Sequence, residues 1–339
     1  MEGIIGVTYR CNARCQMCHT WKFPTKQEEE IKVAYLEKLP QMKFTNITGG
    51  EPFLRKDIDE IVDVVKRKTK RMVISTNGFF TERIVSLAKR HPDIGIRISL
   101  EGLPKTNDNL RGIKNGFDSG LRTLIQLKHL GLKDIGFGIT VSDVNAGDLL
   151  ELYKLAKTMK IEFATAIVHN SYYFHKMDNK IEEKDKVSSE FRKLVTEFLK
   201  SNKIKDWFRA YFNYGIINYI YGGKRPLPCE VGSEVFYLDP FGEIRPCNAM
   251  EQTMGNIKEM SFEKIWQSQQ ADDIRKKVAY CEKNCWMIGS ASPAMKKYIS
   301  KPTRWILENK FLGKQKQTTY LKSKGQQTIE ERSCGKLAE

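Results

Sequence analysis

The chain contains the segment Cys11-Asn12-Ala13-Arg14-Cys15-Gln16-Met17-Cys18. It places three thiols on one short loop directly after a β-type apolar run. Cys thiolates are the usual ligands of iron–sulfur clusters, and three of them would hold a [4Fe–4S] cube while leaving one iron open. An open iron can chelate a small molecule, as the open position of a catalytic zinc does. A structural zinc site or a closed ferredoxin-like cluster is the competing interpretation.

Around this segment, short β-type runs alternate with amphipathic stretches from residue 3 to residue 168. The β-type runs are Ile4–Tyr9, Thr45–Thr48, Met72–Ser75, Ile96–Leu100, Ile135–Val141 and Phe163–Val168. Helices are expected near residues 30–39, 57–69, 81–90, 118–130, 146–159 and 188–200. Regular βα alternation predicts an α/β fold with a parallel sheet, here a partial (β/α)6 TIM-like barrel. Ligands of such barrels bind at the carboxyl ends of the strands, where the loops converge.

The cysteine segment resembles the radical SAM superfamily, and the resemblance extends from about residue 3 to residue 286. Cys11, Cys15 and Cys18 match its CxxxCxxC motif, and Met17 matches the apolar position near the adenine. Thr48-Gly49-Gly50-Glu51-Pro52 matches its GGEP motif, which accepts hydrogen bonds from the methionine ammonium group. Glycines let backbone oxygens approach a ligand closely, and Glu51 can partner a cation. Three looser matches, which are also ordinary turn or capping residues, would line the same SAM pocket: Asn77, Ser99 and Arg111, the last pairing with the SAM carboxylate.

A second group of cysteines lies in the C-terminal half: Cys229, Cys247, Cys281 and Cys285. A turn at residues 240–242 predicts a β-hairpin there, followed by a helix. This region resembles the auxiliary-cluster domains called SPASM and, in the shorter form, twitch. The resemblance implies a second, auxiliary [4Fe–4S] cluster on these four thiols, with a structural zinc ribbon as the alternative. We therefore expect a barrel over residues 1–170, linking helices over 171–228, an auxiliary-cluster domain over 229–290 and a basic tail over 291–339.

Composition limits the compartment and the partners. The 339 residues carry 57 basic and 41 acidic side chains, a net charge of +16. The apolar N-terminal stretch is too short for a signal peptide, and no window reaches the ~18 apolar residues of a membrane span. Eight cysteines in two groups and one leftover, Cys334, do not resemble a secreted disulfide scaffold. These features predict a cytoplasmic protein, and no recognised nucleic-acid-binding motif accompanies the positive charge.

Much of the positive charge lies between residues 294 and 324. Pro302 is well placed to open a helix there, and Trp305, Ile306, Phe311 and Leu312 would give it an apolar side. Such a segment can lie in an anionic membrane interface, which would hold the protein at the inner membrane surface. A solvated tail and a helix docked on the barrel are the alternatives. Cys334 is expected to be dispensable.

The resemblance implies an enzyme that reductively cleaves SAM to a 5′-deoxyadenosyl radical, using electrons from a donor such as flavodoxin or ferredoxin. The radical would abstract hydrogen from a substrate C–H bond. The first hypothesis is oxidation or epimerisation of a sugar, an aminocyclitol or a lipid-linked glycan. Peptide modification is the second, and a non-catalytic Fe–S or zinc protein that binds nucleic acid is the third. His169, at the end of the sixth β-type run, is a candidate general base because its pKa lies near the working pH.

Overall fold

The computed structural model describes residues 1–312, and its core is one nine-stranded sheet. The strand order is β6-β5-β4-β3-β2-β1-β7-β8-β9, and every neighbouring pair from β6 to β7 is parallel. The first six strands are β1 (Glu2–Gly6), β2 (Phe44–Thr48), β3 (Met72–Thr76), β4 (Gly95–Ser99), β5 (Ile135–Val141) and β6 (Glu162–Ile167). This arrangement confirms the predicted α/β fold with a parallel six-stranded barrel core.

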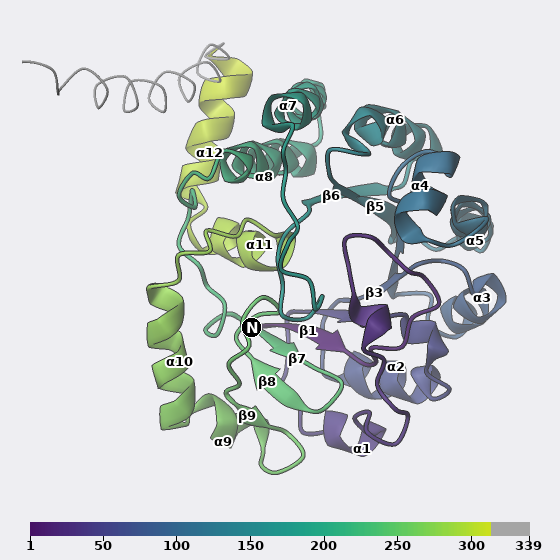
Figure 1. Cartoon of the computed structure of the whole chain (residues 1–339), viewed down its shortest axis with the longest axis vertical. Coiled ribbons are helices and arrows are strands. Elements are labelled where there is room, and N and C mark those ends of the chain that lie inside the picture. The colour runs from purple at the N-terminus through teal and green to yellow at the C-terminus, as the bar shows by residue number, and fades with distance from the viewer. Residues whose placement is uncertain (313–339) are drawn as a thin grey trace, which may run out of the picture.

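Helices cover the outer face of the parallel strands, and the loop after β1 lies inside their arc (Figure 1). The helices of this half are α1 (Val33–Leu36), α2 (Ile58–Arg67), α3 (Thr81–Arg90), α4 (Pro104–Arg111), α5 (Gly116–His129) and α6 (Leu149–Met159). In α2, the buried side chains Ile58, Ile61, Val62 and Val65 recur at helical spacing, as the sequence predicts. The helix α4 was not predicted, because its Asn- and Asp-rich sequence has weak helix propensity.

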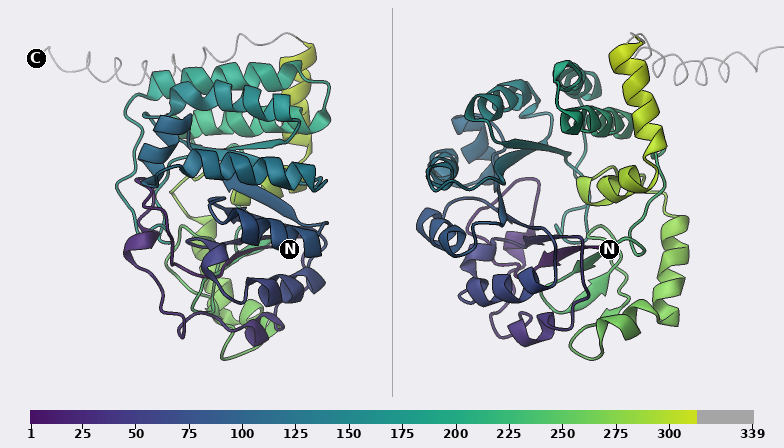
Figure 2. Two further views of the ribbon diagram at one scale, coloured as in Figure 1. Left: turned by 90° about the vertical axis from the view of Figure 1, so that its right-hand side faces the viewer. Right: turned by 180° about the vertical axis from the view of Figure 1, so that it is seen from behind.

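The segment after the barrel forms two long helices, α7 (Lys184–Lys200) and α8 (Ile204–Ile220). They pack side by side at one end of the molecule (Figure 2). The aromatic side chains of α8 are buried or half-buried, with Tyr211 and Phe212 at 4% exposure each. These side chains therefore pack α8 against the rest of the chain, within the region where linking helices were expected (residues 171–228).

The second cysteine group surrounds a β-hairpin that joins the same sheet. The hairpin consists of β7 (Val235–Leu238) and β8 (Glu243–Arg245), which pair antiparallel, and it is followed by β9 (Gly255–Asn256), α9 (Phe262–Trp266) and α10 (Gln269–Ala279). The predicted hairpin and helix are confirmed. Whereas the sequence suggested a small unit beside the barrel, β7 pairs with β1 in parallel from Glu2↔Val235 to Ile5↔Leu238. The hairpin therefore extends the barrel sheet.

The C-terminal part of the described chain is docked on the barrel. Helix α11 (Ile288–Lys297) spans the expected start of the tail at residue 291, and it buries Ala291 and Ala294 in the core. Helix α12 (Ser300–Ile306) packs on α8, where the Trp305 ring lies 5.0 Å from Tyr214 and 5.6 Å from Tyr211 between centroids.

The apolar side chains proposed for membrane contact therefore differ in exposure. Ile306 is 4% exposed, whereas Phe311 and Leu312 are 59% and 66% exposed. Lys314, Lys316, Lys322, Lys324 and Cys334 lie outside the described residues. Among residues 1–312, no helix has the length and apolarity needed to cross a bilayer.

Trp286 is the side chain that fixes the C-terminal segment to α8. It is 1% exposed, its ring stacks near Phe212 at 6.3 Å, and its Nε1 donates a 2.8 Å hydrogen bond to the Phe212 carbonyl. We expect Trp286→Ala to lower the free energy of unfolding by ~3–5 kcal/mol, because it leaves a cavity and an unpaired carbonyl. Chemical denaturation measures this, with Tyr280→Ala, at an 86% exposed site, as the control expected to change little. Equal midpoints for the two variants would contradict the assignment.

Candidate functional site

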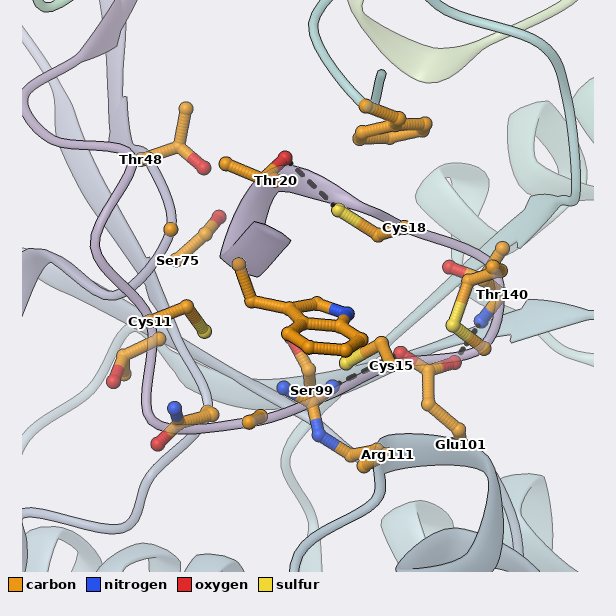
Figure 3. A pocket seen from close by; sticks show the side chains of 18 of the residues that line it. Cys11, Cys15, Cys18, Thr20, Thr48, Ser75, Ser99, Glu101, Arg111 and Thr140 are labelled. Carbon is orange, nitrogen blue, oxygen red and sulfur yellow. Dashed lines mark hydrogen bonds and ion pairs between the residues drawn. The ribbon is translucent and has the colours of Figure 1, made fainter. Parts of the chain in front are cut away.

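The three thiols of the first cysteine group open into one cavity at the carboxyl ends of the parallel strands. Cys11, Cys15 and Cys18 come from the loop after β1, and their side chains surround the same space (Figure 3). Residues of four further strand ends complete the wall: Thr48, Gly49, Gly50, Ser75, Thr76, Asn77, Ser99, Glu101 and Thr140. Met17, Arg111, Trp21 and Phe174 also line it. Residues that are more than 100 positions apart in the sequence thus line one pocket.

Two glycines allow the cysteine loop to lie against the end of β2. The Gly50 amide donates to the Thr8 carbonyl at 2.7 Å, and the Glu51 amide donates to the Arg10 carbonyl at 2.8 Å. A Cβ atom on Gly50 would lie 2.2 Å from the Arg10 oxygen. Gly49 has φ +153°, a conformation that L side chains rarely adopt. The glycines predicted for ligand contact therefore also hold the thiol-bearing loop in place.

Glu51 has a different position from the one expected. Its carboxylate is fully buried and accepts from the Thr76 hydroxyl at 2.7 Å and from the Asn77 amide at 2.7 Å. It also accepts from the Phe53 amide at 3.1 Å. Burial raises the pKa of this carboxyl, and the three donors oppose that rise. Glu51 does not line the cavity, so its carboxylate joins the ends of β2 and β3 instead of facing the ligand space.

An ion pair that was not predicted from the sequence forms part of the cavity wall. The Arg111 guanidinium lies 3.1 Å from the Glu101 carboxylate, and both side chains are almost fully buried. The Thr140 amide donates to the other carboxylate oxygen at 2.6 Å. Burial opposes the charge on Arg111, yet the nearby thiols and Glu101 raise its pKa. Glu101 is the second residue after β4, and this position at a strand end was the signal available in the sequence.

The remaining predicted side chains lie at the same cavity. Met17 and Ser99 line it, as does Asn77, whose amide donates to the Asn12 side chain at 2.6 Å. Burial raises the pKa of all three thiols, that of Cys11 to about 12. Metal binding must displace these protons, and the positive charge of Arg111 favours the thiolate form. The three thiols therefore fit an iron–sulfur cluster. The Arg111 cation and the glycine backbone at the same cavity fit an anionic ligand beside that cluster.

His169 is not among the residues that line the cavity, but its ring contacts one of them. Its Nδ1 is 3.1 Å from the Ile167 carbonyl, and its ring lies 5.1 Å from that of Phe174, which lines the cavity. Its buried Nε2 has no hydrogen-bond partner in the described part of the chain. Burial lowers the pKa of the imidazole. A general-base role of His169 stays a prediction, and it requires the substrate to reach past Phe174.

The second thiol group lies around the hairpin. Cys229 and Cys247 pack against the buried cluster of Val231, Val235 and Val278, while Cys281 is exposed. Burial, together with the nearby Cys229 and Cys285 thiols, raises the pKa of Cys247 to about 12. The four thiols are thus neighbours, and their number suits a fully ligated cluster. Within residues 1–312, no three Cys, His, Asp or Glu side chains already stand at metal-binding distance.

The contact at Gly50 gives a test of the loop architecture. We expect Gly50→Ala to lower the free energy of unfolding by ~1–3 kcal/mol, because the added Cβ must push the Arg10 backbone away. Iron bound after anaerobic reconstitution should fall as well, since the cysteine loop moves with Arg10. Gly147→Ala is the matched control, because nothing lies within 4 Å of a Cβ there. Full iron loading of Gly50→Ala would show that the loop tolerates the displacement.

Comparison with known proteins finds a family match in the N-terminal part and another in the C-terminal part of the chain. The family model for the radical SAM superfamily matches residues 5–156, and the model for the SPASM iron–sulfur cluster-binding domain matches residues 229–286. The fold resembles that of anSMEcpe with bound AdoMet, with a TM-score of 0.62, 14% identity and coverage of 91% of this chain and 98% of that one. At this identity the likeness concerns the fold.

Three curated relatives are informative. Fe-coproporphyrin III synthase of Methanosarcina barkeri is 33% identical over 46% of this chain and 40% of its own length. The subtilosin biosynthesis protein AlbA of Bacillus subtilis is 28% identical over 77% and 58%, respectively. Pre-heme d1 synthase of Dinoroseobacter shibae is 26% identical over 78% and 72%. The chain thus spans about half the length of the first two. It belongs to the radical SAM superfamily, with a C-terminal SPASM-type domain, and uses SAM, a [4Fe–4S] cluster and an auxiliary cluster.

Proposed function

We propose that Cys11, Cys15 and Cys18 hold the SAM-side cluster, and that the chain removes a hydrogen atom from a peptide substrate. When bound, the cluster and SAM supply a 5′-deoxyadenosyl radical for this step. The observation that carries the proposal is the convergence of three thiols, the Gly49–Gly50 backbone and the Glu101–Arg111 pair on one cavity. Proteins of this kind leave the difficult chemistry to the cofactor and supply orientation and exclusion of water.

The wall residues have complementary charges for the amino-acid end of SAM. The Gly49 and Gly50 backbone oxygens would accept from an ammonium group, because neither residue has a side chain that would keep the ligand away. The Gly49 oxygen also accepts from the Tyr173 hydroxyl and has a second lone pair for the ligand. Arg111 is the cation for the carboxylate, and Glu101 holds its guanidinium in place at 3.1 Å. Ser99 and Asn77 add neutral hydrogen-bonding groups. Met17 supplies an apolar contact for the adenine.

The substrate class rests on the relatives and on the rim of the cavity. AlbA, named for biosynthesis of a bacteriocin, aligns with 77% of this chain, and the sporulation killing factor maturation protein SkfB of Bacillus subtilis aligns with 84%, against 78% for pre-heme d1 synthase. Exposed apolar side chains follow four strands: Phe23 after β1, Phe79 after β3, Leu103 after β4 and Val144 after β5. A rim of this kind favours a substrate with apolar groups spread along its length over a single hydrophilic sugar.

Tetrapyrroles are the second candidate substrates, because two of the four relatives named above are synthases of modified hemes or porphyrins by name. The apolar rim suits them as well. None of the relatives named above supports the hypothesis of a sugar, an aminocyclitol or a lipid-linked glycan as substrate. The expected contact with anionic membrane also remains a prediction, since the cations at 314–324 lie outside the described residues.

The auxiliary thiols Cys229, Cys247, Cys281 and Cys285 would hold the second cluster. A substrate radical that loses a proton and one electron leaves an oxidised product, and a cluster can accept that electron. Reduced flavodoxin or ferredoxin would supply the electron that SAM cleavage consumes. The predicted general base, His169, would accept the proton.

Replacing Cys11, Cys15 and Cys18 together with Ala should abolish 5′-deoxyadenosine formation, because no open iron remains to chelate SAM. Iron content should fall by about half, since ~four irons would remain on the second thiol group. Liquid chromatography with dithionite as reductant measures the first, and metal analysis the second. SAM cleavage by the triple variant would refute the assignment. Zinc in place of the residual iron would instead identify a zinc ribbon.

The substrate class can be tested in cells that express the chain or the triple variant. We expect mass changes in peptides that depend on the three thiols, with tetrapyrroles and glycans unchanged. Mass spectrometry of the three fractions provides the measurement, and the triple variant controls for expression of the fold. A change confined to the tetrapyrrole fraction would reject the peptide assignment and support the second candidate.

A further inference from the structure

Thr20 connects a thiol of the SAM-side group to the segment that follows β6. Its Oγ1 lies 3.0 Å from the Cys18 sulfur and 3.1 Å from the Tyr173 carbonyl oxygen, to which it donates. The side chain is 1% exposed, so water does not compete for these contacts. Thr20 is a lining residue of the cavity (Figure 3), and no motif in the sequence marked it.

The Tyr173 segment is attached in turn to the auxiliary thiol loop. The Tyr173 amide donates to the Asn248 carbonyl at 3.1 Å, and the Ser171 hydroxyl donates to the same oxygen at 2.7 Å. Asn248 directly follows Cys247 in the chain. The Tyr173 hydroxyl also donates to the Gly49 carbonyl. A short series of hydrogen bonds therefore joins Cys18 to the residue after Cys247.

The hydroxyl of Thr20 has one hydrogen and two acceptors once Cys18 is a metal-bound thiolate. A thiol can donate to the hydroxyl, whereas a ligated sulfur only accepts. The single hydrogen must then be shared between the sulfur and the Tyr173 carbonyl. A hydrogen bond to a cluster sulfur stabilises the reduced, more negative state and so raises the reduction potential. The position of the Tyr173 carbonyl decides how much of this stabilisation the sulfur receives.

We propose that Thr20 and the Tyr173 carbonyl together set the reduction potential of the SAM-side cluster, and that the Asn248 loop controls this setting. The inference rests on the proposed function, in that Cys18 must be a cluster ligand. Thr20 acts as a positioning residue, since it touches a ligand thiol and not the reacting atoms. The region that holds the second cluster would thereby influence how readily SAM is reduced.

The experiment measures the midpoint potential of the SAM-side cluster in the full chain by EPR-monitored redox titration. Thr20→Val, which keeps the shape and removes the hydroxyl, should move the midpoint to a more negative value. Thr20→Ser should restore it to the wild-type value, because the donor returns. Thr165→Val is the matched control. The Thr165 hydroxyl on β6 is also buried and donates to Asn213 at 2.8 Å, and its removal should leave the midpoint potential of the cluster unchanged.

Ser171→Ala tests the other end of the connection. It removes one of the two hydrogen bonds that hold the Tyr173 segment to the Asn248 carbonyl. The Tyr173 carbonyl should then compete less well for the Thr20 hydrogen, so the Cys18 sulfur receives more of it. The midpoint potential of the cluster should therefore rise. Shifts of opposite sign in Thr20→Val and Ser171→Ala support the proposal, since general loosening moves both in one direction. An unchanged midpoint in Thr20→Val, or a fall in both, overturns it. Absence of a SAM-responsive EPR signal in the wild-type chain would instead reject the proposed function. If Thr20→Val assembles no cluster, the sign of the Ser171→Ala shift decides.

Discussion

The buried carboxylate of Glu30 holds both ends of the loop that carries the three thiols, and the rest of the site depends on it. Glu30 is 4% exposed and receives the Arg10 guanidinium through contacts of 2.9 and 2.8 Å. It also accepts from the Thr25 hydroxyl at 2.6 Å and from the Thr8 hydroxyl. Arg55 adds a second cation at 3.4 Å. A buried charge without partners is costly, whereas this carboxylate has donors on all sides. The loop therefore leaves β1 and returns to it in one fixed arrangement.

The parallel sheet was predictable because its signals are local. Each strand is a short apolar run and each covering helix has its apolar side chains at helical spacing, so β5 and α3 agree with the prediction to the residue. The strand β1 ends at Gly6, three residues before the predicted end, because residues 7–10 pair with the glycine segment. Helix α4 was not predicted, since only tertiary contacts make its polar sequence helical.

The site was predictable where a motif has fixed spacing and unpredictable where chain segments meet. The CxxxCxxC and GGEP residues identify the pocket, and Ser99, Asn77 and Arg111 lie in its wall as expected. No sequence pattern predicts that the Glu51 carboxylate lies outside the pocket, or that the Thr20 hydroxyl donates to the Tyr173 carbonyl. Those contacts depend on how the loop after β6 lies over the loop after β1, and pairs 153 residues apart leave no periodic signal.

The pairing of β1 with β7 has a consequence for how the chain is made. The strand β1 lies between β2 and β7, so one of its edges has no partner until Val235 has left the ribosome. At ~5–20 residues per second, that edge waits on the order of 10–50 s after β1 emerges. An apolar strand with an open edge can pair with other chains. Synthesis thus includes an interval in which the nascent protein is vulnerable to association, and in which chaperones that shield a strand edge have a defined target.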